Sequence, residues 1–522
     1  MLSIFLCWLV IGMASLILGY TFICTFYRNK SEALLRLDVF ILCGLMFINV
    51  YSEAFSLFYK VGGRACLVLA GIGIICLLLH SSRSKEKYVD AMKKMRDVPI
   101  WQWMILFFSL IAMLAWTVGY PTHYDTALYH QQAINWIEEY GVVPGLGNLH
   151  NRFAYNSAFM PLQALFSFKW LTGQSLHTVN GFLCWFFLVY ALETNNLFKG
   201  KPLQLSDCLK IAMVVYIFLS REYISSPTSD IMALLLVLYL CTKWSEFEEE
   251  KCDDVLAYTF LCVLGVWAIS VKLSVATCII LAIYPLTILI RKKMWREMFL
   301  NLILGITVML PWLIRNVVIS GYLLYPYSSI DFFDVDWKMP RSILEYDSKE
   351  IMVWGRAIRD VGQFELPIWK WFPNWWEENN PKCLIIFGIF SVICLVVYLC
   401  LKIIKRNHLI LKKDILIVYS VIGILAWLFS APLMRYGVVY LLLPISIVVN
   451  MLWNYIGNYN KLLKITETVG ILILFPILSL LFAKITVIND VNILRQENYE
   501  WRKTQETVLQ NEIKVWIQIG RA

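Results

Sequence analysis

Long apolar runs recur along the whole chain, and they constrain its fold more than any other feature. About fourteen of them have the length and composition of membrane-spanning helices. Hydrophobic residues fill 59% of the 522 positions and charged residues only 16%, which is more apolar surface than a soluble protein of this size can bury. The sequence therefore predicts an all-α polytopic membrane protein, with spans near 2–27, 37–58, 64–80, 100–119, 178–197, 208–222, 228–245, 255–271, 273–290, 298–319, 383–402, 414–430, 437–455 and 468–487.

Three apolar or aromatic segments have more than one possible interpretation. The apolar run 157–171 is short for a full crossing, so we expect it to be re-entrant or to lie at the membrane interface. The first run, 2–26, lacks a basic segment and a small-residue cleavage site, and we expect a retained helix rather than a signal peptide. The Trp-rich stretch 369–381 is typical of the membrane interface, with stacking against a sugar ring as the alternative.

The basic residues indicate which loops face the inside of the cell. With the N-terminus placed outside, the densest Lys and Arg clusters, at 83–96, 291–296 and 402–413, all fall on the inner side. A spanning 157–171 would move the last two clusters outside, so the positive-inside rule favours the non-spanning interpretation. The net charge of +9 then reflects topology and gives no reason to expect nucleic-acid binding.

This topology divides the chain into three parts. We expect extra N-terminal membrane helices in 1–98, a membrane core in 99–487 and an outer C-terminal tail in 488–522. The core carries two large outer loops, 120–177 and 320–382. The tail is mixed in charge, and we expect it to form a short surface helix.

The first outer loop opens with a long polar and aromatic segment, 121–159. Within it, residues 126–140 predict an amphipathic juxtamembrane helix that lies along the membrane surface. Gly141 ends this helix, and Asp125 stands at its start, where an acid is a favoured N-cap. Asp125 is therefore a helix cap, a catalytic residue, or both. The predicted apolar face holds Tyr129, Ala133, Trp136, Ile137 and Tyr140, and Gln131, Gln132, Asn135, Glu138 and Glu139 lie elsewhere.

Three histidines, His123, His130 and His150, share this loop with Asp125. Their spacing is not that of a known zinc site, and a helix would not place His130 on the same face as Asp125. We therefore predict no metal site formed by these three histidines and Asp125. We expect these side chains to make ordinary hydrogen bonds or to contact a substrate.

Charged residues also gather at the outer ends of other predicted helices. A charge at such an end usually faces a cavity or a partner, although a single Lys or Arg can also extend to the interface. Because several fall on the same side as Asp125, the sequence predicts a polar cavity open to the outer leaflet. Its cations suit a phosphate or pyrophosphate ligand. The residues are Arg221, Glu222, Asp230, Lys272, Arg315 and Arg435, with Tyr436 beside the last.

Four of these features resemble the GT-C superfamily of membrane glycosyltransferases, which use polyprenyl-linked sugar donors. An Asp in the first outer loop precedes an amphipathic helix, here HYDTALYHQQAINWIEEYG. The others are PWLIRNVVISGYLLYP, a mid-chain Lys in SVKLS and an Arg-Tyr in APLMRYG. The resemblance covers about residues 101–455, and the loop also resembles an uncharacterised bacterial group of multi-pass proteins. The three helices before Trp101 and the lack of a second acid beside Asp125 depart from the superfamily pattern.

The resemblance implies an inverting glycosyltransferase of a bacterial cytoplasmic membrane, with its active site on the outer face. Asp125 would take the proton of an acceptor hydroxyl as that hydroxyl attacks the anomeric carbon. Lys272, Arg315 and Arg435 would stabilise the leaving polyprenyl phosphate. The acceptor would be a lipid, a glycan or a protein. The substrate contacts implied are His123, His130, His150, Asn156, Glu222, Asp230 and Tyr436, and an optional divalent ion would sit at Glu222 or Asp230.

Two other functions remain open at this point. A transporter or flippase for lipid-linked glycans would show internal repeats and ionisable residues at mid-bilayer depth, and we see neither in the sequence. A surface-polysaccharide polymerase or ligase would place its charges in a late outer loop, such as Arg341, Arg356 and Arg359 in 320–382. A polar site that contains Asp125 favours the glycosyltransferase, and a site under 320–382 that lacks it favours the ligase.

Overall fold

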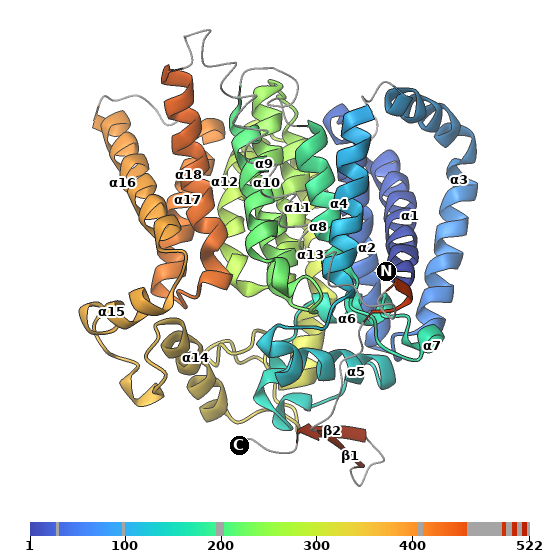
Figure 1. The fold of residues 1–522 in the computed structure, drawn as a ribbon, viewed down its shortest axis with the longest axis vertical. Helices are drawn as coiled ribbons and strands as arrows, with labels where there is room; N and C mark the ends of the chain where they lie inside the picture. The colour runs from blue at the N-terminus through green and yellow to red at the C-terminus, as the bar shows by residue number, and fades with distance from the viewer. Residues whose placement is uncertain are drawn as a thin grey trace.

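The computed structural model is a bundle of long helices, with shorter helices and a small ribbon gathered at one end (Figure 1). It describes residues 1–27, 31–96, 100–194, 203–404, 411–456, 493–496, 504–508 and 514–518. The bundle consists of α1 (Leu2–Phe26), α2 (Leu37–Ser56), α3 (Gly63–Arg96), α4 (Ile100–Val118), α8 (Val179–Thr194), α9 (Leu205–Leu219), α10 (Ser229–Glu249), α11 (Val255–Val271), the 3-10 helix η7 (Leu273–Ala282), α12 (Ile283–Arg291), α13 (Trp295–Ser320), α16 (Lys382–Ile404), α17 (Leu411–Phe429) and α18 (Met434–Ile456).

Six helical segments in the described part of the chain are long and apolar enough to cross a membrane. The protein is therefore a helical, membrane-embedded protein, whereas the predicted count of fourteen spans is not confirmed. Every predicted span up to residue 455 falls on a helix, and 468–487 lies outside the described residues. The six segments are Leu2–Phe26, Leu37–Ser56, Leu273–Arg291, Trp295–Ser320, Lys382–Ile404 and Met434–Tyr455.

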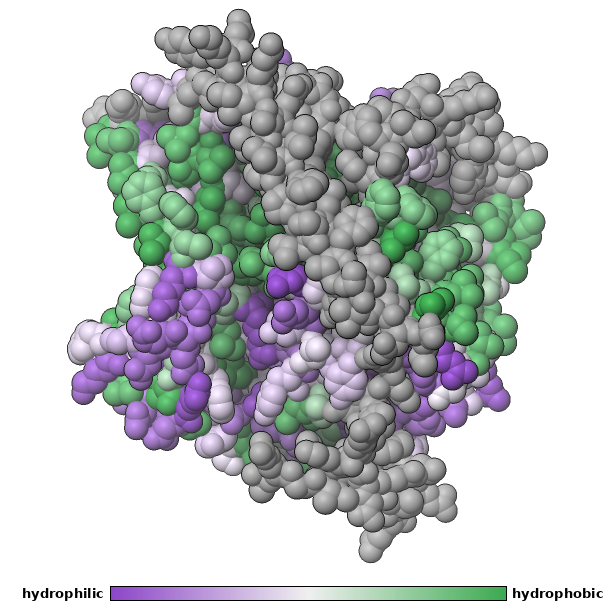
Figure 2. All heavy atoms as spheres, viewed as in Figure 1, coloured by the Kyte–Doolittle hydropathy of each residue, from purple (hydrophilic) through white to green (hydrophobic). Residues whose placement is uncertain are grey.

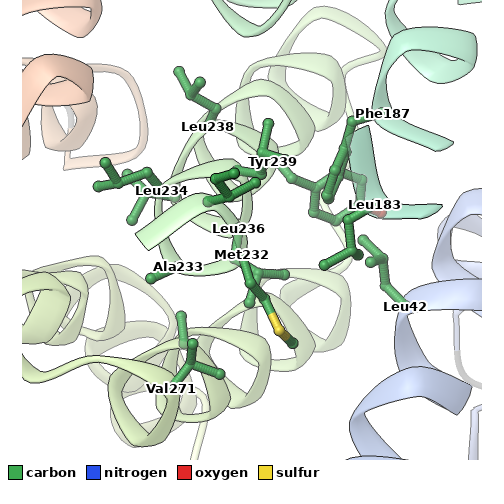
Figure 3. Close-up of a cluster of buried hydrophobic side chains, with 14 of the residues drawn as sticks. Leu42, Leu183, Phe187, Met232, Ala233, Leu234, Leu236, Leu238, Tyr239 and Val271 are labelled. Carbon is green, nitrogen blue, oxygen red and sulfur yellow. The ribbon is translucent and has the colours of Figure 1, made fainter. Parts of the chain in front are cut away.

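Helix α10 lies at the centre of the bundle, because nearly its whole length is buried. Its buried residues are mostly apolar and surround the helix, which is the pattern of a helix enclosed by protein. In Figure 3 its side chains point toward Leu42 of α2, Leu183 and Phe187 of α8 and Val271 of α11. This packing on all sides makes α10 a rigid support for Asp230 in its first turn.

The shorter helices form a second layer across one end of the bundle (Figure 1). In the same view, Figure 2 shows hydrophilic residues gathered around α14 and α15 and hydrophobic residues over the long helices above them. Both large predicted outer loops thus lie at the same end of the molecule. The first loop supplies α5 (Gln131–Glu139), α6 (Phe159–Leu165) and α7 (Lys169–Thr172), and the second supplies α14 (Arg341–Gly355) and α15 (Ile368–Glu378).

Helix α5 differs from the predicted surface helix. A π-helical turn, Thr126–His130, leads into it, and its predicted polar face is buried in the protein. Ser175 donates a hydrogen bond to Glu138 Oε1 at 2.7 Å, and Lys169 donates one to Asn135 Oδ1 at 2.6 Å. The helix itself is confirmed, and polar partners from the segment that follows α6 make its polar face an internal one; its position along the membrane surface stays a prediction. The buried polar side chains are Gln131, Gln132, Asn135 and Glu138.

Two other segments can be compared with their predictions. The run 157–171 forms α6 and α7, of seven and four residues, which are too short to cross a bilayer. The tail forms two antiparallel strands, β1 (Thr504–Val508) and β2 (Lys514–Gln518), and not the expected surface helix. Their sequences, TQETV and KVWIQ, are rich in β-branched and aromatic residues, which favour strands.

The first two helices share hydrogen bonds with the rest of the bundle. Trp8 Nε1 of α1 donates to the carbonyl of Thr178 at 2.9 Å, and Trp267 Nε1 of α11 donates to Asn49 Oδ1 of α2 at 2.8 Å. Asn49 Nδ2 in turn donates to the carbonyl of Ala158, in the first outer loop, at 2.6 Å. The N-terminal helices, predicted as an addition to the core, thus hold part of that loop.

Candidate functional site

Four segments that are far apart in the sequence bring polar side chains together beside the first outer loop. The loop itself contributes three of these side chains: His123 and Asp125 before the π-helical turn, and His130 within it. Lys272 lies in an extended break between α11 and η7, so its side chain leaves the end of a buried helix. We name the group the Asp125 cluster, and it comprises His123, Asp125, His130, Asp230, Lys272, Arg435 and Tyr436.

Asp125 stands directly before the π-helical turn, but its side chain does not cap it. Its Oδ2 accepts a hydrogen bond from Arg435 Nη1 at 2.8 Å, and the two residues form an ion pair. A carboxylate beside a guanidinium makes a charge-assisted bond, which is stronger than a neutral one. The interpretation of Asp125 as a helix cap is therefore wrong, and the side chain belongs to the polar cluster.

A second ion pair lies beside the first. Lys272 Nζ pairs with Asp230 Oδ1 and also lies over the ring of Tyr436, 4.1 Å from its centroid. Arg435 Nη2 donates to the Tyr436 hydroxyl at 2.9 Å. Tyr436 therefore touches both cations, one through its ring and one through its oxygen, and keeps them close together.

His123 connects the two ion pairs. Its Nε2 lies 3.2 Å from Arg435 Nη1 and 3.9 Å from Asp230 Oδ2. Its Nδ1 accepts a hydrogen bond from the backbone N–H of Asp125 at 3.2 Å. The ring of His130 stacks on it, with 5.8 Å between ring centroids. Sequence reasoning expected these two histidines to make hydrogen bonds or to contact a substrate, and both lie beside Asp125.

Burial and the neighbouring charges shift the pKa of the Asp125 carboxyl in opposite directions. Burial raises the pKa of its carboxyl, but Arg435, His130, His123 and Lys272 outweigh burial, so the pKa lies below its ordinary value of 3.8. For His123, burial lowers the pKa to about 4, with Arg435 acting in the same direction. At neutral pH the cluster thus contains an ionised Asp125 and a neutral His123.

The structure places Arg315 and Asn156 in a different polar group. Arg315 Nε donates to Asn156 Oδ1 at 3.1 Å, and Arg315 Nη1 donates to Ser56 Oγ. Arg315, predicted to face the same phosphate as Lys272, is therefore buried among side chains that fix the loop to α2 and α13.

Two more of the predicted contacts lie away from the Asp125 cluster. His150 is exposed, and its Nδ1 accepts the backbone N–H of Arg152 as the cap of a short 3-10 helix, Asn151–Ala154. The side chain of Glu222 is 64% exposed and pairs with Arg221 at 3.7 Å. Sequence reasoning grouped them by their side of the membrane, which carries no information on which side chains meet.

Three residues that the sequence did not single out contact the cluster. The ring of Tyr129 meets that of His130 at 4.3 Å, although its spacing placed it on an apolar helix face. The ring of Tyr223 meets that of His123 edge-on at 4.9 Å. Ser226 Oγ accepts the backbone N–H of His123 at 3.0 Å. The one available signal was the polar, aromatic text SREYISSPTSD between two apolar runs.

The arginines of the second outer loop each have partners within or beside that loop. Arg341 pairs with Glu345 at 2.8 Å, and Arg359 pairs with Glu378 at 2.9 Å, and all four side chains are largely exposed. The Arg356 guanidinium lies over the ring of Trp371, 5.7 Å from its centroid. These contacts give no reason to place a catalytic site under this loop.

Carboxylates and imidazoles in the cluster raise the question of a metal. Within the described ranges, no group of three or more His, Cys, Asp or Glu side chains is arranged to hold a metal ion. The two carboxylates of the cluster, Asp125 and Asp230, each face a cation instead. The cluster offers a carboxylate that can take up a proton and two cations, Lys272 and Arg435, that can bind an anion.

Comparison with known proteins assigns a family without an activity. Residues 1–442 match the family described as Domain of unknown function (DUF8201). No curated protein and no solved structure matches the chain. The matched range includes all seven residues of the Asp125 cluster and the N-terminal helices. This chain is therefore a member of the DUF8201 family.

Proposed function

We propose that this protein is a membrane glycosyltransferase that moves a sugar from a polyprenyl-phosphate-linked donor to an acceptor hydroxyl. The observation that carries the proposal is the ion pair of Asp125 with Arg435, set beside Lys272 and Asp230. Such a group offers a base and two cations in one place, which this reaction needs. The resemblance to GT-C enzymes supports the same assignment.

In the proposed reaction, the acceptor oxygen attacks the anomeric carbon as the bond from that carbon to the phosphate oxygen breaks. The acceptor proton passes to Asp125, which is ionised at neutral pH and so is ready to receive it. Lys272 and Arg435 stabilise the charge that grows on the departing phosphate. Attack opposite the leaving group inverts the anomeric carbon.

The decisive variant is Asp125→Asn, which keeps the shape of the side chain and removes its basicity. We expect sugar transfer to fall by about 100-fold or more, the usual contribution of a general base. Mass spectrometry of surface glycans should then match that of cells lacking the protein. Unchanged glycans would exclude Asp125 as the base.

The matched control is Asp334→Asn, which changes an exposed acid in the second outer loop. It should leave the glycans as they are in the wild type. Both variants should be present in the membrane in equal amounts and should elute as single species in detergent. This separates a lost base from a misfolded protein.

A further inference from the structure

His123 lies between the two ion pairs, and its hydrogen bonds determine where its proton lies. Its Nδ1 accepts the backbone N–H of Asp125 at 3.2 Å. Its Nε2 faces another donor, Arg435 Nη1, also at 3.2 Å, and a neutral imidazole can accept only one of the two bonds. Because Arg435 Nη1 already has Asp125 Oδ2 as its acceptor at 2.8 Å, the lone pair is assigned to Nδ1. Because burial keeps this imidazole neutral at neutral pH, the one ring proton must be on Nε2.

The proton on Nε2 meets a second donor. Arg435 Nη1 lies 3.2 Å from Nε2, and a guanidinium has no lone pair to accept with. The nearest acid oxygen, Asp230 Oδ2, is 3.9 Å away, which is beyond hydrogen-bonding distance. The side chain is only 4% exposed, so water has little access to this N–H.

The ring is held in this orientation by its surroundings. Ser226 Oγ accepts the backbone N–H of His123, Tyr223 meets the ring edge-on, and His130 stacks against it. Turning the ring over would leave the N–H of Asp125 without its acceptor. A fixed, buried donor that points at another donor is suited to an acceptor atom that arrives with a ligand.

We propose that His123 donates its Nε2–H to a phosphate oxygen of the ligand, which sits against His123 and Arg435. This inference rests on the proposed function and adds a residue to it. The two carboxylates and two cations of the cluster already balance in charge. A neutral donor therefore strengthens phosphate binding without adding a charge that must be buried.

His123 keeps its proton throughout the transfer step. The bond between the anomeric carbon and the phosphate oxygen breaks, the acceptor oxygen bonds to that carbon, and the acceptor proton goes to Asp125. The leaving oxygen receives the hydrogen bond of Nε2 as its negative charge grows. His123 is thus a binding residue for the phosphate and not an acid or a base.

Two substitutions separate the two ring nitrogens. In His123→Asn, the side-chain oxygen can replace Nδ1 as the acceptor for Asp125, while nothing replaces the Nε2–H. In His123→Gln, the longer amide places an N–H near the position of Nε2. The probe is farnesyl phosphate, with farnesol as the control that has the same chain and no phosphate.

We expect His123→Asn to weaken farnesyl phosphate binding by about tenfold, the value of one hydrogen bond to a charged group, and His123→Gln to restore much of it. His150→Asn, at the exposed histidine outside the cluster, should change nothing. Farnesol binding should be the same in all three variants. Equal binding of farnesyl phosphate by wild type and His123→Asn would overturn the role of His123 and leave the proposed function standing.

Nitrogen-15 NMR of histidine-labelled protein in nanodiscs tests the proton position directly. The resonances that disappear in His123→Asn should report a neutral ring protonated at Nε2, and farnesyl phosphate should shift them. A ring protonated at Nδ1, or a charged ring, would refute the proposal about His123 without any reference to activity. If wild-type protein does not bind farnesyl phosphate at all, the proposed donor class is wrong as well.

Discussion

Asp125 obtains its chemical character from residues far away in the chain. Arg435 is 310 positions distant, yet it supplies the hydrogen bond that a helix cap would have used. The same holds for Lys272 and Asp230, which are 42 positions apart, with Asp230 in the first turn of α10 and Lys272 in the extended break after α11. A residue's type and local pattern mark it as a candidate, but the partner that sets its charge comes from the fold.

Removing Arg435 should raise the pKa of Asp125. Burial alone raises it, and Arg435 is the largest of the influences that lower it. In the wild type the carboxyl should therefore gain a proton only as pH falls below the ordinary value of 3.8. In Arg435→Met it should gain one at higher pH, and the acid side of any pH–rate profile should move upward. Carbon-13 NMR of labelled aspartate, with the Asp125 signal assigned by Asp125→Asn, measures this.

Arg341→Met is the control for the measurement of the Asp125 pKa. Arg341 pairs with Glu345 on the exposed surface of α14, outside the Asp125 cluster. This variant should leave the titration of Asp125 as it is in the wild type. An Asp125 pKa that is the same in Arg435→Met and the wild type would show that the ion pair does not control the carboxylate.

At the scale of whole elements, the sequence predicted where helices begin and end better than it predicted which of their faces are buried. Apolar runs place α1, α2 and α13 almost to the residue, because a membrane helix must be apolar over its length. Helix α5 shows the limit. The spacing of its apolar residues predicted a helix. The burial of Glu138 and Asn135 depends on Ser175 and Lys169, and no local sequence pattern connects these two residues to α5.

The candidate site shows the same limit. Its sequence signal was a set of charges on one side of the membrane, and seven of the eleven predicted residues do meet in the Asp125 cluster. Arg315 and Glu222 shared that signal, yet one lies in another buried group and the other is exposed. The predicted side of the membrane limits candidate site residues to one end of the bundle. Which of those side chains touch one another depends on how the helices pack.

Helix α15 holds the turn that carries Arg435 into the site. Trp375 Nε1 donates to the carbonyl of Pro432 at 2.6 Å, and Trp427 Nε1 donates to that of Leu433 at 2.8 Å. Trp375→Phe keeps an aromatic ring and removes the first bond, which should cost about 1 kcal/mol. Hydrogen exchange followed by mass spectrometry should show faster exchange in residues 430–436.

Trp369→Phe is the control on the same helix, because Trp369 is 73% exposed and its indole has no part in holding the turn. It should change stability by less than about 0.5 kcal/mol and leave exchange at 430–436 unaltered. If exchange there is equally slow in Trp375→Phe and the wild type, the turn is held by other contacts.

At the scale of the whole molecule, the N-terminal helices are joined to the rest by buried hydrogen bonds around Arg315. Glu53 of α2 is fully buried and accepts a hydrogen bond from Asn49 at 3.1 Å, while Arg315 of α13 is 2% exposed. Arg315 donates hydrogen bonds to Asn156 and Ser56, so it sits where α2, α13 and the first outer loop meet. The family match over 1–442 also includes these helices. Helices that looked like an addition in the sequence thus help to position the loop that begins at Asp125.

A double-mutant cycle on Ser56 and Arg315 tests this joint. Either Ser56→Ala or Arg315→Met alone removes the hydrogen bond from the guanidinium to the hydroxyl and leaves one buried polar group without that partner, which should cost about 1.5–3 kcal/mol of stability in detergent unfolding. The double variant removes both partners, so its cost should be well below the sum of the two. The exposed pair Arg341–Glu345 provides the control cycle, where the coupling should be under about 1 kcal/mol. Costs that add to within about 0.5 kcal/mol at Ser56 and Arg315 would mean that the two side chains act independently, and the attachment of α2 to α13 would then not depend on this hydrogen bond.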